Sequence, residues 1–280
     1  MNQILHCGPY RLSLDRPLVM GIINATPDSF SGDGLAFDVA RAVDQAQQFI
    51  TDGADVLDIG GESTRPGSQP VSAEDELRRV VPVIEALAGL GVPLSIDTWK
   101  PEVMRAALAA GATIVNDING LRAPGAVDVV AATDAAVCIM HMQGTPQTMQ
   151  LSPSYADVCR EVTDFLLQRA RCAQDAGIDR SRIMLDPGFG FGKTSEHNLM
   201  LIKGLGTLAD QGYPLLVGLS RKSVLGRLTG RPVTDRVAAS VAAALASVAH
   251  GAHMVRVHDV AATCDALAVW QVAGISGGRT

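Results

Sequence analysis

Residues 18–24 read LVMGIIN, an apolar run that ends in the polar amide of Asn24. Comparable runs recur along the chain, among them AVCIMHM at 136–142 and PLLVGLS at 214–220. Runs that are almost continuously apolar, rather than alternating, are typical of parallel strands covered on both faces. The pattern therefore predicts a parallel sheet with helices packed against it.

Eight such runs alternate with helical patterns along the chain of 280 residues. They cover 18–24, 56–62, 94–97, 114–117, 136–141, 183–186, 215–220 and 254–258. Repeated strand–helix units without a break in composition favour a closed barrel over an open sheet. We therefore predict an α/β fold, a (β/α)₈ TIM barrel, with residues 1–280 as a single domain. Residues 3–16 are expected to form a short N-terminal hairpin at the bottom of the barrel.

Two predicted helices have unusual sequences. One has an apolar face at Leu77, Val81, Ile84 and Leu87. Ser72 provides its start signal, and Pro82 within it is expected to kink the helix or delay its start. The other, at 235–250, is rich in alanine and apolar nearly all round. Such a helix must be buried, either in the core or at a subunit contact of a homodimer.

Composition excludes several classes of protein. Apolar residues make up 47% of the chain and charged residues 19%, so a large core is possible and disorder is not expected. The net charge of −6 argues against a nucleic-acid partner but allows a local basic pocket for a small anion. Five scattered cysteines without a CxxC pair predict neither a disulfide framework nor a zinc site. Without a signal sequence or a membrane-spanning run, the protein is expected to be soluble and cytoplasmic, with no membrane partner.

Nearly every predicted strand ends in a polar side chain. These side chains are Asn24, Glu62, Asp97, Asn116, His141, Asp186, Lys222, Arg256 and His258. The C-terminal ends of barrel strands converge on one mouth, where enzymes of this fold carry their active sites. One such residue often only caps a turn, but a whole ring of them predicts a shared polar site.

By their chemistry the polar residues fall into two sets. One offers an amide, a hydroxyl and cationic donors without a paired carboxylate: Asn24, Thr64, Arg65, Arg256 and His258. Guanidinium groups bind phosphate oxygens in pairs, so this set suits a phosphate or a diphosphate. The other combines two carboxylates with an amide and an ammonium: Asp97, Asn116, Asp186 and Lys222. A carboxylate can accept two parallel N–H bonds, so this set predicts recognition of a guanine-like heterocycle.

Three segments rich in glycine, serine or proline follow predicted strands. The loops 25–37 and 63–71 each begin at a polar strand end, and the first carries Phe30, so we expect both to act as lids over the site. The segment DPGFGFGK at 186–193 is dense in glycine but lacks the rest of a dinucleotide-binding fingerprint.

The motifs of the chain resemble those of the dihydropteroate synthase family, in the expected order and over nearly the whole length. The matching segments are GIINATPDSFSGDG (21–34), DIGGESTRPG (58–67), SIDTWKPEV (95–103), NDING (116–120), MHMQGTPQTMQ (140–150), LDPGFGFGKT (185–194), LVGLSRKSVLG (216–226) and RVHDV (256–260). The chain departs from the usual pattern at SGDG (31–34) and at Trp99, and the second change is expected to alter only the rim of the site.

This resemblance implies a transferase reaction of folate biosynthesis. p-Aminobenzoate would capture the methylene cation that forms when 6-hydroxymethyl-7,8-dihydropterin diphosphate loses diphosphate, giving 7,8-dihydropteroate. By resemblance the pterin is bound by Asp97, Asn116, Met140, Asp186, Gly218 and Lys222. The diphosphate is bound by Asn24, Thr64, Arg65, Arg256 and His258, with Mg²⁺ as cofactor bridging its oxygens and Asn24. The p-aminobenzoate site, which sulfonamides would also occupy, is formed by Phe30, Pro66, Phe191 and Ser223. The catalytic residues are then Asn24, Asp97, Lys222, Arg256 and His258.

Three alternatives fit a barrel of this kind. A pterin methyltransferase would share the heterocycle set but would not need STRPG or the RVH end. A sugar-phosphate aldolase or isomerase would call for a Schiff-base lysine on strand six or a Glu/His base pair. A barrel without activity, kept as a binding protein, would not need the full set of site residues.

Overall fold

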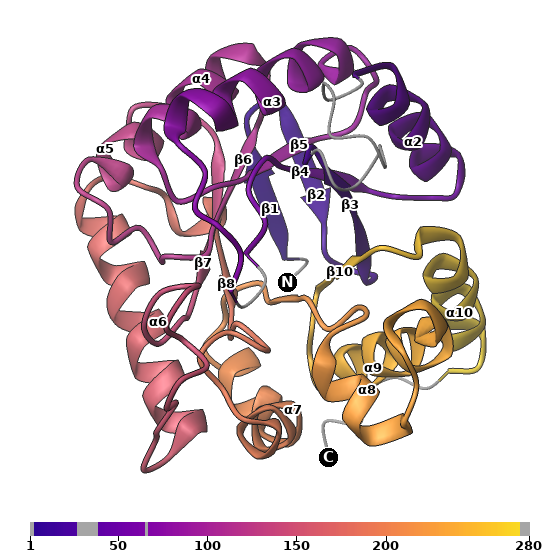
Figure 1. Cartoon of the computed structure of the whole chain (residues 1–280). Helices are drawn as coiled ribbons and strands as arrows, with labels where there is room; N and C mark the ends of the chain where they lie inside the picture. The colour runs from indigo at the N-terminus through magenta and orange to yellow at the C-terminus, as the bar shows by residue number, and fades with distance from the viewer. Residues whose placement is uncertain (1–2, 27–38, 65–66, 275–280) are drawn as a thin grey trace.

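Eight parallel strands form a barrel at the centre of the molecule (Figure 1). The structure, a computed structural model, describes residues 3–26, 39–64 and 67–274. The barrel strands are β3 (Leu18–Asn24), β4 (Val56–Gly60), β5 (Leu94–Asp97), β6 (Ile114–Asp117), β7 (Ala136–Met140), β8 (Ile183–Asp186), β9 (Leu216–Val217) and β10 (Met254–Val257). They pair in the order β8-β7-β6-β5-β4-β3-β10-β9, and a parallel bridge between Leu185 and Leu215 closes the ring. The predicted TIM barrel is confirmed, although β9 is shorter than the run at 215–220.

Helices surround the barrel and connect its strands (Figure 1). They are α2 (Val39–Thr51), α3 (Ala73–Leu87), α4 (Pro101–Ala110), α5 (Ala126–Ala131), α6 (Val158–Asp175), α7 (Ser195–Ala209), α8 (Ser223–Thr229), α9 (Val237–Ala249) and α10 (Val260–Val272). Two short 3₁₀ turns, η1 (Arg180–Arg182) and η2 (Val233–Asp235), precede β8 and α9. Because the barrel strands all pair in parallel, each strand ends at the same mouth of the barrel.

Residues along each strand alternate between two separate apolar clusters. On β4, Leu57 and Ile59 belong to the large cluster between the strands and the helices, whereas Val56 belongs to a smaller cluster inside the barrel. The pleat of a strand explains this period of two residues. Asp58 therefore also faces inward, one layer above Val56.

The same alternation holds on other strands. The lower inward layer is apolar and contains Val56, Ile114, Met184 and Met254. Two residues further along the same strands come Asp58, Asn116, Asp186 and Arg256. The barrel interior thus changes from apolar to charged within two residues.

A hairpin covers the N-terminal end of the barrel. It consists of β1 (Ile4–Cys7) and β2 (Tyr10–Ser13), which pair antiparallel. Leu5 and Cys7 are fully buried and belong to the interior cluster of the barrel. The predicted hairpin at 3–16 is confirmed, and it closes the barrel opposite the polar mouth.

Helix α3 begins where the sequence predicts, because the Ser72 side chain accepts a hydrogen bond from the amide of Asp75. The expectation that Pro82 delays the start is wrong, since the helix runs through this residue from Ala73. Glu76, in the first turn, is fully buried rather than solvated, because it pairs with Lys100.

Helix α9 is buried on one face only. Its buried residues are Ser240, Ala243, Ala244 and Ser247, whereas Val237 is 38% exposed. The core alternative for this helix, with burial on all its sides, is therefore wrong, because only one face of the helix packs against the barrel. A subunit contact stays a prediction. Over the residues that the structure describes, no helix has both the length and the apolar character to cross a membrane.

Candidate active site

A buried network of charged side chains lies in the inward layer at the mouth of the barrel. Arg256 on β10 donates from Nε to Asp58 on β4 at 2.6 Å and from Nη2 to Asp97 on β5 at 2.7 Å. Asn116 on β6 donates from Nδ2 to the same Asp58 oxygen at 3.2 Å. Four strands are thereby joined by two carboxylates, one guanidinium and one amide.

Within the part of the chain that the structure describes, two carboxylate oxygens of this network have no hydrogen-bond donor. Oδ1 of Asp58 and Oδ1 of Asp97 are buried oxygens with no hydrogen-bond partner among the described residues. A buried oxygen without a partner is costly, so a ligand that supplies N–H donors would relieve this cost. The two orphaned oxygens therefore favour a heterocycle rich in N–H groups at this layer.

Burial and neighbouring charges shift the acid–base behaviour of this layer. Burial raises the pKa of Asp97 to about 7, with Arg256 opposing the shift and Asp58 adding to it. Burial alone would lower the pKa of Arg256, but Asp58 and Asp97 outweigh it and raise the pKa above its ordinary value. Arg256 is thus a permanent cation beside a carboxyl group that titrates near neutral pH.

Asp186 and Lys222 form the second part of the site. Asp186 accepts a hydrogen bond from the backbone N–H of Gly188 at 2.7 Å. Burial raises the pKa of Asp186, and the charge of Lys222 opposes this shift. The Lys222 ammonium donates to the carbonyl of Phe189 and lies 4.6 Å from the centre of the Phe191 ring. Burial lowers the pKa of Lys222 to about 8, with Asp186 opposing. The predicted carboxylate and ammonium therefore lie in one electrostatic environment.

Small and apolar residues shape the space beside these charges. A Cβ placed on Gly218 would lie 3.8 Å from Cβ of Arg256 and 3.9 Å from Nζ of Lys222, so the glycine separates the two cations without filling the gap. Met140 is buried in an apolar cluster with Ile118, Met142 and Met149, against which Phe191 packs. This cluster provides an apolar wall for a flat ring.

The residues predicted to bind an anion lie at adjacent strand ends. Asn24 ends β3 in register with Gly60, which in turn pairs with Asp97. His258 follows β10, and its Nδ1 lies 3.0 Å from Oγ of Ser220. Thr64 is half-buried in the loop after β4.

Other predicted residues lie elsewhere or are not described. Ser223 is the exposed first residue of α8, directly after Lys222. Phe30, Arg65 and Pro66 fall outside the residues that the structure describes, as does most of the loop 25–37.

Comparison with known proteins agrees with this geometry. A family model described as pterin binding enzyme matches residues 20–258. The dihydropteroate synthase of Neisseria meningitidis serogroup B is 51% identical over 98% of this chain and 99% of that protein. The chain belongs to the dihydropteroate synthase family.

Solved structures of dihydropteroate synthases share the whole fold. The Xanthomonas albilineans enzyme with 4-aminobenzoic acid has a TM-score of 0.92 and 52% identity, and the match covers 98% of each chain. The Burkholderia cenocepacia enzyme complexed with 7,8-dihydropteroate has a TM-score of 0.89 and 53% identity, covering 97% of this chain and 96% of that one. The resemblance seen in the sequence motifs is confirmed, and with it the assignment of the chain to a family of transferases.

The structure corrects the division into two sets. The sequence predicts Arg256 in an anion set without a paired carboxylate, but it is bonded to both Asp58 and Asp97. The reason is that inward-facing positions on β4, β5 and β10 meet in one layer of a closed barrel. Arg256 therefore lies between the predicted heterocycle residues and the predicted anion residues of this dihydropteroate synthase family member.

Two polar strand ends do not face the mouth. His141 lies against Phe165 of α6, with ring centroids 4.9 Å apart, and contacts the Lys193 ammonium. Glu62 accepts from Lys100 at 2.6 Å, on the side of the barrel where α3 packs. His141 has the parity of the outward-facing Ile139, since side chains alternate across a strand, whereas Glu62 lies two residues beyond the end of β4.

The ion pair of Glu62 with Lys100 anchors the base of the loop 63–71. Lys100 also forms an ion pair with Glu76 of α3. The second carboxylate oxygen of Glu62 accepts a hydrogen bond from the backbone N–H of Val71 at 3.1 Å. Burial raises the pKa of Glu76, with Lys100 opposing. The loop that carries Thr64 is therefore fixed at both of its ends.

Sequence reasoning missed two buried charged residues at this end of the barrel, Asp58 and Lys193. Asp58 lies within the predicted strand run 56–62, and a carboxylate between Leu57 and Ile59 is itself a signal, since a charge that is fully buried requires a partner. Lys193 ends the glycine-rich segment and is 3% exposed. Its local sequence gives no indication of this burial.

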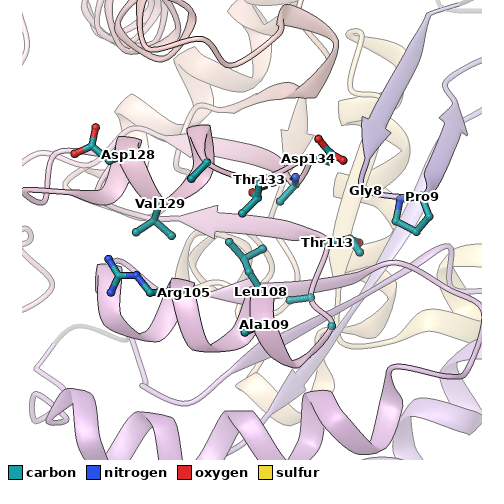
Figure 2. A pocket seen from close by; sticks show the side chains of 14 residues that line it. Gly8, Pro9, Arg105, Leu108, Ala109, Thr113, Asp128, Val129, Thr133 and Asp134 are labelled. Atoms are coloured by element: carbon teal, nitrogen blue, oxygen red, sulfur yellow. Dashed lines mark hydrogen bonds between the residues drawn. The ribbon is translucent and has the colours of Figure 1, made fainter.

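A cavity of about 760 Å³ lies away from this site. It is lined by α4, α5 and the turn of the N-terminal hairpin, with Leu108, Val129 and Pro9 on its walls (Figure 2). Among the residues that the structure describes, none of those predicted to bind substrate lines it. The candidate active site is therefore the polar mouth and not this apolar cavity.

Proposed function

We propose that this chain condenses 6-hydroxymethyl-7,8-dihydropterin diphosphate with p-aminobenzoate to give 7,8-dihydropteroate and diphosphate. The observation that carries the proposal is the buried layer in which Arg256 joins Asp58 and Asp97 beside Asn116. Its two orphaned carboxylate oxygens suit the N–H groups of a pterin.

The pterin is bound by the inward layer and its neighbours. Asp186 accepts the paired N–H bonds of the amino-pyrimidinone edge, and Asn116 and Asp97 bind the remaining polar edge of the ring. Lys222 donates to a ring acceptor from the Gly218 side, while Met140 contacts the ring face. Because Asp97, Asn116, Met140 and Asp186 are held by strands, the ring orientation is fixed before the second substrate binds.

The diphosphate is bound by Asn24, Thr64, Arg65 and His258, with Arg256 shared between the pterin and the anion. Among the described residues no group of three His, Cys, Asp or Glu side chains could hold a metal ion. Mg²⁺ commonly binds through few protein oxygens and completes its shell with phosphate oxygens and water. The Asn24 amide at the end of β3 suits such a site, and Mg²⁺ bound there would neutralise charge on the departing diphosphate.

The chain's own residues favour departure of the leaving group. The C–O bond to diphosphate breaks with its electron pair on oxygen, and the amine lone pair of p-aminobenzoate then forms the C–N bond and releases a proton to solvent. Arg256 and His258 stabilise the negative charge that develops on diphosphate, and the Asp97 carboxylate stabilises the cationic pterin methylene. An aryl amine is nucleophilic when neutral, so no strong base is needed.

p-Aminobenzoate binds between the two loops and the end of β8. Phe191 provides one wall beside Lys222, and Phe30, Pro66 and Ser223 complete the pocket. A lid over the site, the role expected for the loops 25–37 and 63–71, would exclude water, which would otherwise capture the cation. Sulfonamides, which share the shape of an amino-substituted ring, compete for the same pocket.

The enzyme works as a cytoplasmic homodimer in this proposal. The exposed side of α9 continues into apolar residues of α8 and α10, since Leu228, Val237 and Val269 are 57%, 38% and 70% exposed. Apolar groups on adjacent helices favour a subunit contact. Sedimentation at micromolar concentration, with Val269→Glu as the variant expected to give monomers, tests this part.

The test of the function is product formation from both substrates. Purified protein with dihydropterin diphosphate, p-aminobenzoate and Mg²⁺ is expected to release diphosphate and 7,8-dihydropteroate in equal amounts. Omitting p-aminobenzoate should leave only slow hydrolysis. Methyl transfer to a corrinoid, or no turnover with tight pterin binding, would contradict the proposal.

A further inference from the structure

One buried ammonium has no part in the reaction described above. Lys193, between β8 and α7, is 3% exposed, and its Nζ lies near four acceptors. These are the carbonyl oxygens of Gly188 at 2.9 Å, Phe191 at 3.0 Å and His141 at 3.3 Å, and Nδ1 of His141 at 2.9 Å. An ammonium group has three N–H donors and suits such a cage of oxygen and nitrogen acceptors.

The cage exists because the loop after β8 is pressed against the end of β7. A Cβ on Gly188 would lie 1.9 Å from the carbonyl oxygen of His141, and one on Gly192 would lie 2.5 Å from that of Gln143. Both glycines have positive φ, so the loop needs glycine for its conformation and for its close approach. Carbonyl oxygens that converge in this way repel one another unless a cation lies between them.

His141 completes the cage as a neutral acceptor. Its ring is buried against Phe165 and Tyr155, and burial, together with the charge of Lys193, lowers its pKa far below the ordinary value. The unprotonated Nδ1 can therefore accept from the Lys193 ammonium. Burial lowers the pKa of Lys193 as well, with Asp186 opposing.

The same loop supplies three contacts of the active site. The amide of Gly188 donates to Asp186, the carbonyl of Phe189 accepts from Lys222, and the Phe191 ring lies under the Lys222 ammonium. Two of the carbonyls on Lys193 come from this stretch, at Gly188 and Phe191. The position of Lys222 and of the Phe191 wall therefore depends on how the loop is held.

We propose that Lys193 is a positioning residue, a fixed internal cation that folds 188–191 against β7 and so sets Lys222 and Phe191 for the two substrates. The substrate assignments rest on the proposed function, whereas the cation cage rests on the geometry alone. Lys193 itself touches neither substrate.

The main test replaces Lys193 by Met, which keeps the length and removes the charge and the donors. In Lys193→Met, the KM for p-aminobenzoate and the Kd for the pterin should each rise on the order of 10–100-fold, since a small misplacement of substrate groups is costly. Lys203→Met, at an exposed position of α7, is the matched control and should leave both constants unchanged. Unchanged KM and Kd in Lys193→Met, even with lower thermal stability, would overturn the proposal.

Chemical rescue separates a cation requirement from simple packing. In Lys193→Ala, which leaves space in the cage, added ammonium or methylammonium should restore the KM for p-aminobenzoate, and tetramethylammonium should not. Lys193→Met, whose side chain fills the space, should not respond to any of these ions. Absence of rescue by the small ions would contradict the internal-cation role.

A readout without turnover keeps this test apart from the proposed function. Amide hydrogen exchange of residues 188–192 should be faster in Lys193→Ala and should slow again with ammonium, whether or not the enzyme makes dihydropteroate. If neither variant folds, Lys193→Gln, which keeps two N–H donors without the charge, takes its place in the same measurements. Exchange and KM equal to wild type in that variant would refute the proposal.

Discussion

The two ends of the barrel interior are built from the same strands but from opposite kinds of residue. Near the hairpin, Val56, Ile114, Met184 and Met254 fill the barrel with apolar volume. Two residues later, the same strands present Asp58, Asn116, Asp186 and Arg256 to the mouth. The comparison separates stability from function within one set of strands, because these lower residues belong to an apolar cluster whereas the upper layer keeps carboxylate oxygens, unpartnered among the described residues, for a ligand.

The difference has a physical basis in how each layer is satisfied. Apolar side chains gain free energy simply by losing contact with water, so the lower layer needs no particular partner. Buried charges require matched partners, and the upper layer finds them only across the barrel. A change in the lower layer should therefore act on the free energy of unfolding, and a change in the upper layer on binding and turnover.

The largest expected effect is loss of pterin binding in Asp186→Asn. An amide presents one acceptor and one donor group where the pterin edge needs two acceptors, so one N–H is left without a partner. Binding measured by calorimetry should weaken by about 1000-fold or more, a loss of the order seen when a site built for a hydrogen bond cannot form it. Affinity within a few-fold of wild type would remove Asp186 from the pterin site.

A slightly smaller effect is expected for Asp58→Asn. The substitution removes one of the two carboxylates that hold Arg256, so the guanidinium is no longer fixed for charge stabilisation. The kcat/KM for pterin diphosphate should fall on the order of 10²–10³-fold, the cost of losing one oriented electrostatic contact. The matched control is Val56→Ala on the same strand, which should lower thermal stability and leave kcat/KM close to wild type.

Met184→Ala in the lower layer should instead destabilise the fold. Removing a fully buried side chain leaves a cavity, and the free energy of unfolding should fall by about 2–5 kcal/mol. Denaturant unfolding measures this loss, and the KM values for both substrates measured below the melting temperature should not change. A rise in either KM would show that the two layers are coupled.

Pterin affinity should depend on pH through Asp97. Burial raises its pKa to about 7, and Arg256, Asp58 and Glu76 are among the charged groups that act on it. As the pH falls below about 7, Asp97 takes up a proton and loses an acceptor for the ring, so affinity should fall by up to about tenfold per pH unit. Calorimetry between pH 5 and 8 tests this. In Asp97→Asn, the loss of pterin affinity at low pH should disappear.

The smallest effect is expected at the apolar cavity beside the hairpin turn. Arg105, at its rim, is exposed, and Arg105→Ala should change the free energy of unfolding by less than about 0.5 kcal/mol. Turnover should be unchanged, because no described residue predicted to bind substrate lines this cavity. Loss of activity in this variant would place a functional region at the hairpin end of the barrel, opposite the polar mouth.

Much of the fold followed from local pattern. Continuous apolar runs marked the barrel strands, and their first residues agree with the structure in nearly every case, since burial on both faces leaves a signal within a few residues. The run at 215–220 was too long, as β9 ends at Val217 and the chain then turns through Gly218 toward Lys222. Strand ends are set by the loops that follow, which the local pattern does not describe.

The sequence predicts which residues gather at the candidate site better than it predicts how they are arranged there. Asp97, Asn116, Asp186 and Arg256 do converge on one mouth, because the ends of parallel barrel strands must. His141 does not, and the face on which it lies was decided by packing against Phe165 and Lys193. A polar residue at a strand end thus indicates how high along the barrel axis its side chain lies, but not whether the side chain faces into the barrel or away from it.

The sequence by itself determined the number and order of the strand–helix units, the family and the chemical types of the residues at the mouth. Only the tertiary structure decided which of those residues are bonded to one another. Arg256 and Asp58 are separated by 198 positions in the chain, yet each is the other's partner. Strand formation depends on the polarity of near neighbours, which a sequence displays directly, whereas the pairing of buried charges depends on which inward positions meet when the barrel closes.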